Sequence, residues 1–413
     1  MKRIIFALAL CAGVLLSGPH IGPAQIAIAQ DPAAPRSQSF DQRQQLLPAA
    51  SSAQKGKLTE ETLKKIEAAV ETERKRLNIP GLSVAIAVGN QIVYSNGFGM
   101  ADLENSIPAK ATTVYRTASI AKPMTAVAVM QLAERGRLDL DAPIQKYCLA
   151  FPEKNWPVTA RQLLGHLSGV RHYKARNESA GTEHFFTLAD SLKTFKDDPL
   201  LFEPGTKYSY TTFGYSVLGC AIEGASGMSY EECMREHVWK PAGMEQTQVD
   251  DHFMIIPNRA RGYMKLREND LTQLPPHLKA RVKAGDLVNA QLHDTSMKIP
   301  GGGIASTAID LVKFAIAMQT DKLAGPETRE QMWTSQKTKD GKETGYGLGW
   351  SIGQTAEGMR LILHNGNQAG ARSELSLLPA KGSVIAIMAN ISDVPLNEVL
   401  RVVGREVMAA LKE

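Results

Sequence analysis

Strand-forming segments occur near both ends of this chain, and helix-forming segments occupy the stretch between them. Near the amino-terminal end, Leu82–Val88 and Gln91–Tyr94 are rich in strand-forming residues and are joined by Gly89-Asn90, a pair typical of a hairpin turn. Near the other end, three similar runs follow one another: Leu361–Leu363, Arg372–Leu378 and Val384–Met388. Strands this far apart in sequence can share a core only if the two ends come together. We therefore predict one α+β domain assembled from both ends, with an inserted, mainly helical domain.

The helical prediction rests on apolar residues that recur every three or four positions. Thr59 can cap a first helix that ends near Leu77, and a last helix is predicted from Leu396 to Leu411. The segments predicted to be helical in the middle of the chain are Thr125–Arg135, Thr159–Gly165, Phe213–Ala225, Tyr230–Trp239 and Thr307–Gln319. The predicted folded domain spans residues 58–413, with 58–120 and 323–413 as its α/β part and 121–322 as its helical part.

The first thirty residues have the organisation of an export signal. Lys2 and Arg3 precede an apolar run from Ile4 to Leu16, and the small-x-small tripeptide Ala27-Ile28-Ala29 precedes Gln30. The apolar run is shorter than the ~20 residues that span a bilayer, so a retained membrane anchor is the weaker alternative. We predict a signal peptide at 1–29, a flexible linker rich in Pro, Ala, Ser and Gln at 30–57, and a periplasmic or secreted protein without a stable membrane span.

Composition narrows the possible partners. The net charge is only +5 over 413 residues and no long basic run is present, so a nucleic-acid partner is not predicted. The nine histidines never take a His-Glu-x-x-His spacing and the four cysteines form no paired clusters, so no metal and no cofactor are predicted.

Three cysteines remain once a signal peptide is removed: Cys148, Cys220 and Cys233. An odd number leaves at least one thiol unpaired in an oxidising compartment. We expect all three to be small buried apolar side chains, with a Cys220–Cys233 bridge as the alternative.

The quartet Ser119-Ile120-Ala121-Lys122 could carry nucleophilic chemistry. Residues i and i+3 share a helix face, which would place Lys122 beside the Ser119 hydroxyl. A serine is a poor nucleophile until a neighbour takes its proton, and a desolvated neutral lysine can do so. By itself the pattern is weak, because Ser52-Ala53-Gln54-Lys55 in the linker matches it by chance.

The surrounding motifs strengthen this interpretation. In chain order they are Phe98–Asp102, Tyr115–Lys122, Leu163–Val170, Pro204–Tyr215, Gly301–Thr307, Tyr346–Trp350 and His364–Gly366. This ordered series resembles the serine β-lactamase and penicillin-binding-protein superfamily, in particular its class C-like branch, which includes esterases, D-aminopeptidases and a mitochondrial β-lactamase-like protease. The resemblance extends from about Leu63 to Ala410 and implies an antiparallel sheet of five or more strands flanked by helices.

The resemblance also implies roles for individual residues. Ser119 would be the acylated nucleophile and Lys122 its proton partner. Tyr210 matches the tyrosine of the family's second motif, and the hydroxyl of that tyrosine takes part in general acid–base catalysis. We expect positive charge on Lys122 and His364 to help Tyr210 lose its proton.

The family's third motif, Lys-Thr-Gly, corresponds here to His364-Asn365-Gly366. Gly366 would let a substrate backbone approach the strand closely. The oxyanion hole would be formed by the backbone N–H groups of Ser119 and Asn367.

Two departures from the family pattern bear on the substrate. Thr212 stands where the second motif usually has Asn, and His364 and Asn365 replace the Lys and Thr of the third motif. A histidine is only partly charged at pH 7, so a β-lactam carboxylate would be held less firmly. An esterase or peptidase acting on small acyl, ester or peptide substrates is therefore predicted. The alternatives are a class C-type β-lactamase and a non-hydrolytic binding or assembly protein, and the oligomeric state is not predicted.

Three other motifs favour structural roles. Ser351 lies in a Gly-x-Ser-x-Gly pattern, but Tyr346–Ile352 alternates like a strand and no helix follows, as a nucleophile elbow requires. Gly301–Gly303 lacks the Lys-Ser/Thr ending of a phosphate loop and is expected to form a tight approach before a helix capped by Thr307 and Asp310. His166 is expected to bond to backbone in a helix-to-loop turn.

Overall fold

The central element is an antiparallel sheet of seven strands in the order β3-β2-β1-β12-β11-β10-β9. The structure is a computed structural model that describes residues 58–411, so the predicted signal peptide and the whole predicted linker lie outside the described residues. The strands of this sheet are β1 (Gly81–Val88), β2 (Gln91–Asp102), β3 (Ile107–Pro108), β9 (Ser351–Gln354), β10 (Arg360–Gln368), β11 (Ala371–Leu378) and β12 (Ser383–Ala389).

The two ends of the chain meet where β1 pairs with β12. The antiparallel register places Leu82 opposite Ala389 and Val84 opposite Ile387. Every residue of β1 is buried, because helices cover both faces of the sheet at this strand. The predicted α+β fold, with a sheet of five or more strands built from both ends, is confirmed.

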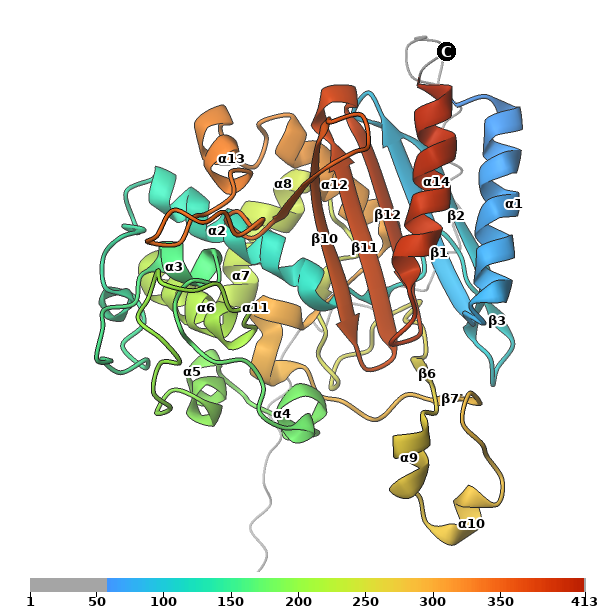
Figure 1. The fold of residues 1–413 in the computed structure, drawn as a ribbon, viewed down its shortest axis with the longest axis horizontal. Coiled ribbons are helices and arrows are strands. Elements are labelled where there is room, and N and C mark those ends of the chain that lie inside the picture. Colours follow the sequence, from blue (N-terminus) through green and yellow to red (C-terminus); the bar gives the residue numbers. More distant parts are fainter. Residues whose placement is uncertain (1–57, 412–413) are drawn as a thin grey trace, which may run out of the picture. The chain divides into compact units, whose positions relative to one another are not determined.

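Helices α1 (Glu60–Arg76) and α14 (Leu396–Ala410) lie side by side on one face of the sheet (Figure 1). Thr59 caps α1 as predicted, since its hydroxyl accepts the backbone N–H of Thr62 at 3.1 Å. The apolar stripes of both helices pack on alternate residues of β1 and β12 and form a separate core. Their side chains are Ile66, Val70, Val399, Val403 and Val407.

The opposite face of the sheet carries the larger core and the inserted helices. Helix α12 (Ala308–Gln319) packs directly on β1 and β12, although it belongs to the segment 121–322. Thr307 caps it through the Asp310 N–H at 3.1 Å. The other helices are α2 (Ala121–Glu134), α3 (Ala160–Leu164), α4 (Arg176–Ala180), α5 (Leu188–Ser191), α6 (Phe213–Ser226), α7 (Tyr230–Met234), α8 (Lys240–Ala242), α9 (Glu268–Thr272), α10 (Pro276–Lys279), α11 (Ile299–Gly302) and α13 (Pro326–Met332).

Several short strands outside the main sheet were not predicted. β4 (Tyr115–Arg116), β8 (Ile304–Ser306) and β5 (Gln248–Val249) form a small sheet beside the main one, and β6 (Tyr263–Lys265) pairs with β7 (Leu287–Asn289). Each is two or three residues long, which is too short to produce a recognisable alternation. Among residues 58–411, none of the helices combines the length and the apolar character needed to cross a bilayer.

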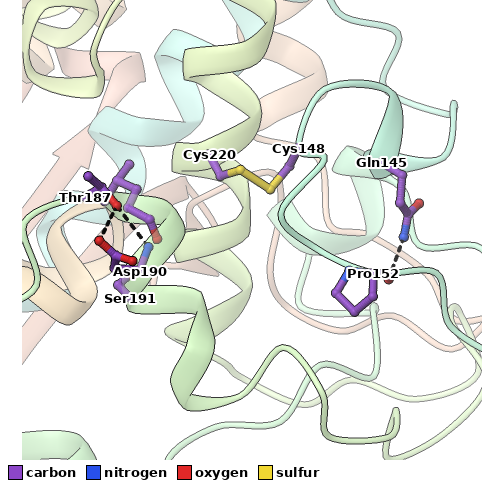
Figure 2. Close-up of a disulfide and its surroundings, with 8 residues drawn as sticks. Gln145, Cys148, Pro152, Thr187, Asp190, Ser191 and Cys220 are labelled. Atoms are coloured by element: carbon purple, nitrogen blue, oxygen red, sulfur yellow. Dashed lines mark hydrogen bonds between the residues drawn. A yellow bond between two sulfur atoms is a disulfide. The ribbon is translucent and has the colours of Figure 1, made fainter.

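A disulfide joins Cys148 to Cys220, with 5.3 Å between their Cα atoms (Figure 2). It ties the loop after Ile144–Lys146 to helix α6, while Cys233 remains a free, buried thiol. The prediction of three unpaired thiols is therefore wrong, and so is the alternative Cys220–Cys233 bridge. The correct partners are 72 residues apart and meet only through the packing of the helical segment.

Candidate active site

Ser119 lies at the start of a helix that points away from the sheet. A 3₁₀ turn, Ala118–Ile120, runs directly into α2, so Lys122 follows Ser119 by one turn on the same face. The Lys122 Nζ and Ser119 Oγ atoms are 3.2 Å apart. Ala118 has φ of +48°, in the left-handed region that a residue with a side chain seldom adopts. The geometry predicted for the Ser-x-x-Lys quartet is present, and the backbone before the nucleophile is strained.

Lys122 is fully buried and is held by neutral groups. Its Nζ donates to Thr212 Oγ1 at 3.1 Å and to the Gly301 carbonyl at 2.7 Å, and it lies 4.8 Å from the centre of the Tyr210 ring. No acidic side chain of the described residues forms an ion pair with it. Burial, followed by the positive charge of Lys298, holds the pKa of Lys122 well below its usual range. A neutral Lys122 can accept the Ser119 proton.

Tyr210 lies in the loop that leads into α6 and faces the same hydroxyl. Burial raises the pKa of Tyr210 above its ordinary value, and the hydrogen bond with Ser119 opposes this only in part. The resting tyrosine is therefore a protonated phenol. The expectation that positive neighbours would ionise it is wrong, because burial raises the pKa of Tyr210 more than its neighbours lower it.

His364 on β10 is turned into the core. The side chain is 3% exposed, its Nδ1 lies 2.7 Å from the Asn365 carbonyl, and its Nε2 lies 2.9 Å from the Tyr346 hydroxyl. A carbonyl can only accept, so Nδ1 carries the proton and Nε2 accepts from Tyr346. Burial and the nearby Lys122 lower the pKa of His364 to about 3. The prediction of a positive charge on His364 is therefore wrong, because the imidazole is buried and bonded to Tyr346 and to its own strand.

The rest of the third motif follows the alternation of β10. Asn365 and Asn367 are exposed and line the cavity beside Ser119, whereas Gly366 is buried. A Cβ atom on Gly366 would collide with the Thr117 carbonyl and the Ser373 hydroxyl. The glycine thus lets β10 lie against the turn that carries the nucleophile, which is a different reason from the substrate approach that we expected.

One edge of β10 remains available next to the nucleophile. β9 pairs only with the first part of β10, from Arg360 to Leu363, so no described strand covers that edge beyond Leu363. The turn carrying Ser119 lies against this part of β10, since a Cβ atom on Gly366 would meet Thr117 and Ala118. The Asn367 side chain is fixed by Asp393, to which its Nδ2 donates at 2.7 Å. The predicted oxyanion donors, the N–H groups of Ser119 and Asn367, therefore belong to two neighbouring elements, and their role stays a prediction.

A cavity of about 500 Å³ opens onto Ser119. Tyr210, Thr212, Asn365 and Asn367 also line it, so the structure brings together most of the predicted site residues; Lys122 and His364 lie behind its wall. Gly301 packs tightly there as expected, since a Cβ atom on it would lie 2.6 Å from Thr212 Cγ2.

Two residues of the cavity wall were missed by the sequence analysis. Lys298 is 3% exposed, donates from Nζ to the Ser179 carbonyl at 2.7 Å, and has its pKa lowered to about 7, chiefly by burial and then by Arg116. His172 accepts the Thr212 N–H at its Nδ1, 3.2 Å away. The only signal for Lys298 was its position just before Gly301–Gly303.

Two weaker candidates have structural positions. His166 is fully buried and its Nδ1 accepts the Thr211 N–H at 3.2 Å, which confirms the predicted backbone bond. Ser351 begins β9 and precedes a strand residue rather than a helix, which excludes the nucleophile-elbow geometry. The predicted strand from Tyr346 is present only from Ser351 onward.

Comparisons with known proteins agree with this site. A family model described as Beta-lactamase matches residues 66–407. The serine beta-lactamase-like protein LACTB of Homo sapiens, a mitochondrial protein by its name, is 30% identical over 78% of this chain and 76% of its own length. Penicillin-binding protein 4* of Bacillus subtilis is 28% identical over 70% of this chain and 63% of its own length.

Solved structures show the same fold. The octameric penicillin-binding protein homologue from Pyrococcus abyssi superposes with a TM-score of 0.70 at 26% identity, covering 85% of this chain and 77% of that one. The D-amino acid amidase of Ochrobactrum anthropi superposes with a TM-score of 0.71 at 22% identity, covering 85% of this chain and 99% of that one, which shows the fold alone. With the family model spanning most of the domain, this chain belongs to the beta-lactamase family, within the serine β-lactamase and penicillin-binding-protein-like superfamily.

Proposed function

We propose that this protein is an exported serine hydrolase that cleaves small esters, amides or peptides through an acyl-enzyme on Ser119. The observation that carries the proposal is the 3.2 Å contact between the Ser119 hydroxyl and Lys122, whose pKa burial lowers, beside an open cavity. Such a pair supplies both a nucleophile and the group that removes its proton.

The proposed acylation step uses only groups of this chain. Ser119 Oγ attacks the substrate carbonyl carbon while its proton moves to Lys122 Nζ, and the carbonyl oxygen becomes an anion at the Ser119 and Asn367 N–H groups. As the tetrahedral species collapses, the bond to the leaving group breaks and that group receives the proton held by Lys122, either directly or through the Tyr210 hydroxyl, which is reprotonated by Lys122. Water then attacks the ester by the reverse path and releases the acid.

The side chains around Lys122 favour an ester or amide substrate over a β-lactam. Thr212 accepts a hydrogen bond from Lys122 and therefore orients the lysine, where the family's usual Asn would offer an amide to the substrate. His364 is neutral and lies behind the wall, so it provides no persistent cation for a β-lactam carboxylate. A neighbour in fold is named a D-amino acid amidase, which supports amides of D-amino acids among the substrates to test.

Lys298 is the cationic group we assign to an anionic part of the substrate. One of its three N–H bonds is used by the Ser179 carbonyl, so two remain for a carboxylate in the cavity. Lys298 therefore replaces His364 as the proposed binding group for an anionic part of the substrate.

Export is part of the proposal. The organisation of residues 1–29 supports it, and so does the Cys148–Cys220 disulfide, because such bonds persist in oxidising compartments. Amino-terminal sequencing of the protein from cell fractions tests it: we expect a periplasmic or secreted chain that begins at Gln30, and a cytoplasmic chain that retains Met1 would contradict it.

The activity is tested with a panel of p-nitrophenyl esters, D-amino-acid amides, D-Ala-D-Ala peptides and the β-lactam nitrocefin. We expect turnover of esters or amides to exceed that of nitrocefin. Faster nitrocefin hydrolysis would favour the β-lactamase alternative. Labelling of Ser119 by penicillin or a fluorophosphonate without turnover of any substrate would favour a binding protein on the same fold.

A further inference from the structure

Two histidines and an aspartate from three separate loops meet outside the candidate active site. His184 lies between α4 and α5, His252 follows β5, and Asp294 precedes the turn Ser296–Lys298. The Nδ1 atoms of His184 and His252 lie 2.8 and 2.7 Å from the same oxygen, Asp294 Oδ2. The three ligand-type atoms all lie within 4.8 Å of one another.

Asp294 is fixed so that one oxygen is left for this cluster. Its Oδ1 accepts the Ser296 N–H at 2.7 Å, and its own N–H donates to the Gly181 carbonyl at 2.9 Å. Its other oxygen, Oδ2, is the one that both imidazoles face.

We propose that His184, His252 and Asp294 form a binding site for a zinc-like divalent transition metal. Two imidazole nitrogens and one carboxylate oxygen suit Zn²⁺, whereas Ca²⁺ and Mg²⁺ favour oxygen ligands alone. Tetrahedral bonds of about 2.0–2.1 Å place ligand atoms about 3.3 Å apart, so the two Nδ1–Oδ2 pairs need to open by only about half an ångström.

The surroundings of the cluster leave a path for the ion and a shell around it. Asp294 lines two neighbouring hollows of about 630 and 420 Å³, which give water a route to a remaining coordination position. The rings of Phe186 and Phe253 pack on His184 with centroids 4.7 and 4.9 Å away. These aromatic contacts cover part of the His184 ring.

The site would also fix one wall of the catalytic cavity. Ser179 and Ala180, a few residues before His184, line that cavity. Their carbonyls accept from Lys298 Nζ and Gln291 Nε2, both in the segment that carries Asp294. A metal at the cluster would therefore hold the loops with His184 and His252 to this segment. The spacing of the three ligands, 68 and 42 residues, is invisible to motif searches.

The test is zinc binding by the full mature chain, without a polyhistidine tag, after treatment with a chelator. Isothermal titration with ZnCl₂ is expected to show about one equivalent bound with micromolar or tighter affinity, and ZnCl₂ but not MgCl₂ is expected to raise the thermal midpoint. His252→Gln and Asp294→Asn should each weaken zinc binding at least ~10-fold, and the double variant His184→Gln/His252→Gln at least ~100-fold.

His277→Gln is the matched control, since His277 is exposed and lies on α10, outside the cluster. It should bind zinc like the wild type. Circular dichroism checks that each variant is folded, and His252→Gln changes a side chain that is already 45% exposed, so this variant keeps the test decisive if the others unfold. No zinc binding by the wild type, or equal binding by wild type and His252→Gln, would overturn the proposal. Neither result depends on hydrolytic activity.

Discussion

At the scale of single residues, burial without an acidic partner lowers the pKa of two basic side chains in the site. Lys122 and His364 are both buried without an acidic partner, and burial lowers the pKa of both. For Lys122 this creates a base, whereas for His364 it removes the charge expected from the sequence. The motif positions were predictable, but the protonation states were not, because spacing does not reveal which groups surround a side chain.

Lys298 gives the site a pH dependence of its own. Its pKa is lowered to about 7, so the side chain is charged below that pH and neutral above it. We expect KM for carboxylate-bearing substrates to rise as pH increases through 7, while KM for neutral esters stays flat. Steady-state kinetics from pH 5.5 to 8.5 measure this. Lys298→Met should remove the difference between the two substrate types, and a persistent difference would exclude Lys298 as the anion-binding group.

His364→Lys tests the environment of the third motif. The new ammonium group would be buried near Lys122 without an acidic partner, so we expect a loss of at least ~2 kcal/mol in unfolding free energy and no gain in β-lactam hydrolysis. Urea unfolding followed by circular dichroism measures the loss, with exposed His277→Lys as the control. A stable variant with raised nitrocefin turnover would show that position 364 does serve charge recognition.

At the scale of elements, the disulfide fastens helix α6 to the loop that precedes α3. It closes a sequence separation of 72 residues, for which the loss of unfolded-chain entropy corresponds to about 4 kcal/mol. The double variant Cys148→Ala/Cys220→Ala should therefore be less stable than the wild type by an amount of this order in guanidinium unfolding under oxidising conditions.

The free thiol supplies the control for the disulfide. Cys233→Ala changes a buried side chain without breaking a covalent link. A reductant should lower the stability of Cys233→Ala as it does that of the wild type, and should leave the double variant unchanged. Equal stability of the wild type with and without reductant would contradict the expected contribution of the bridge.

Strand β11 carries a buried ionisable group, Glu374. Burial raises its pKa to about 7, against a weaker opposing effect of Arg372. The folded state thus binds this proton more tightly than the unfolded state, so its contribution to stability is complete below the ordinary pKa of 4.5 and is lost as pH rises through 7.

Glu374→Gln should remove that loss. Relative to the wild type, the variant should gain about 3 kcal/mol in unfolding free energy between pH 4.5 and pH 8.5, with the gain appearing between those values. Urea unfolding at several pH values measures the difference. A constant difference across the whole range would show that Glu374 does not titrate in this way.

At the scale of the whole molecule, the sequence predicted the architecture better than the contacts inside it. The hairpin at Gly89-Asn90 and the late strands carry strong local patterns, so the sheet built from both ends was predictable. Ser119 and Lys122 were also predictable, since one helical turn relates them.

What the sequence did not predict depends on packing between distant segments. Cys148 reaches Cys220, Lys298 reaches the cavity wall, and His184 reaches His252 only in the folded chain. None of these pairs or positions leaves a periodic signal, and the resemblance to a family did not specify them. Local periodicity therefore allowed the helices and strands to be predicted. The disulfide and the protonation of the site residues depend on tertiary packing and could not be predicted.

The central claim is that Ser119 forms the acyl-enzyme, and peptide mapping by mass spectrometry after reaction with a fluorophosphonate tests it most directly. We expect one modification, on the peptide that contains Ser119, together with loss of ester turnover. Ser119→Ala should be unlabelled, should remain folded and should turn over esters at least ~10³-fold more slowly. Labelling at Ser351 or another residue, or full turnover by Ser119→Ala, would contradict the account.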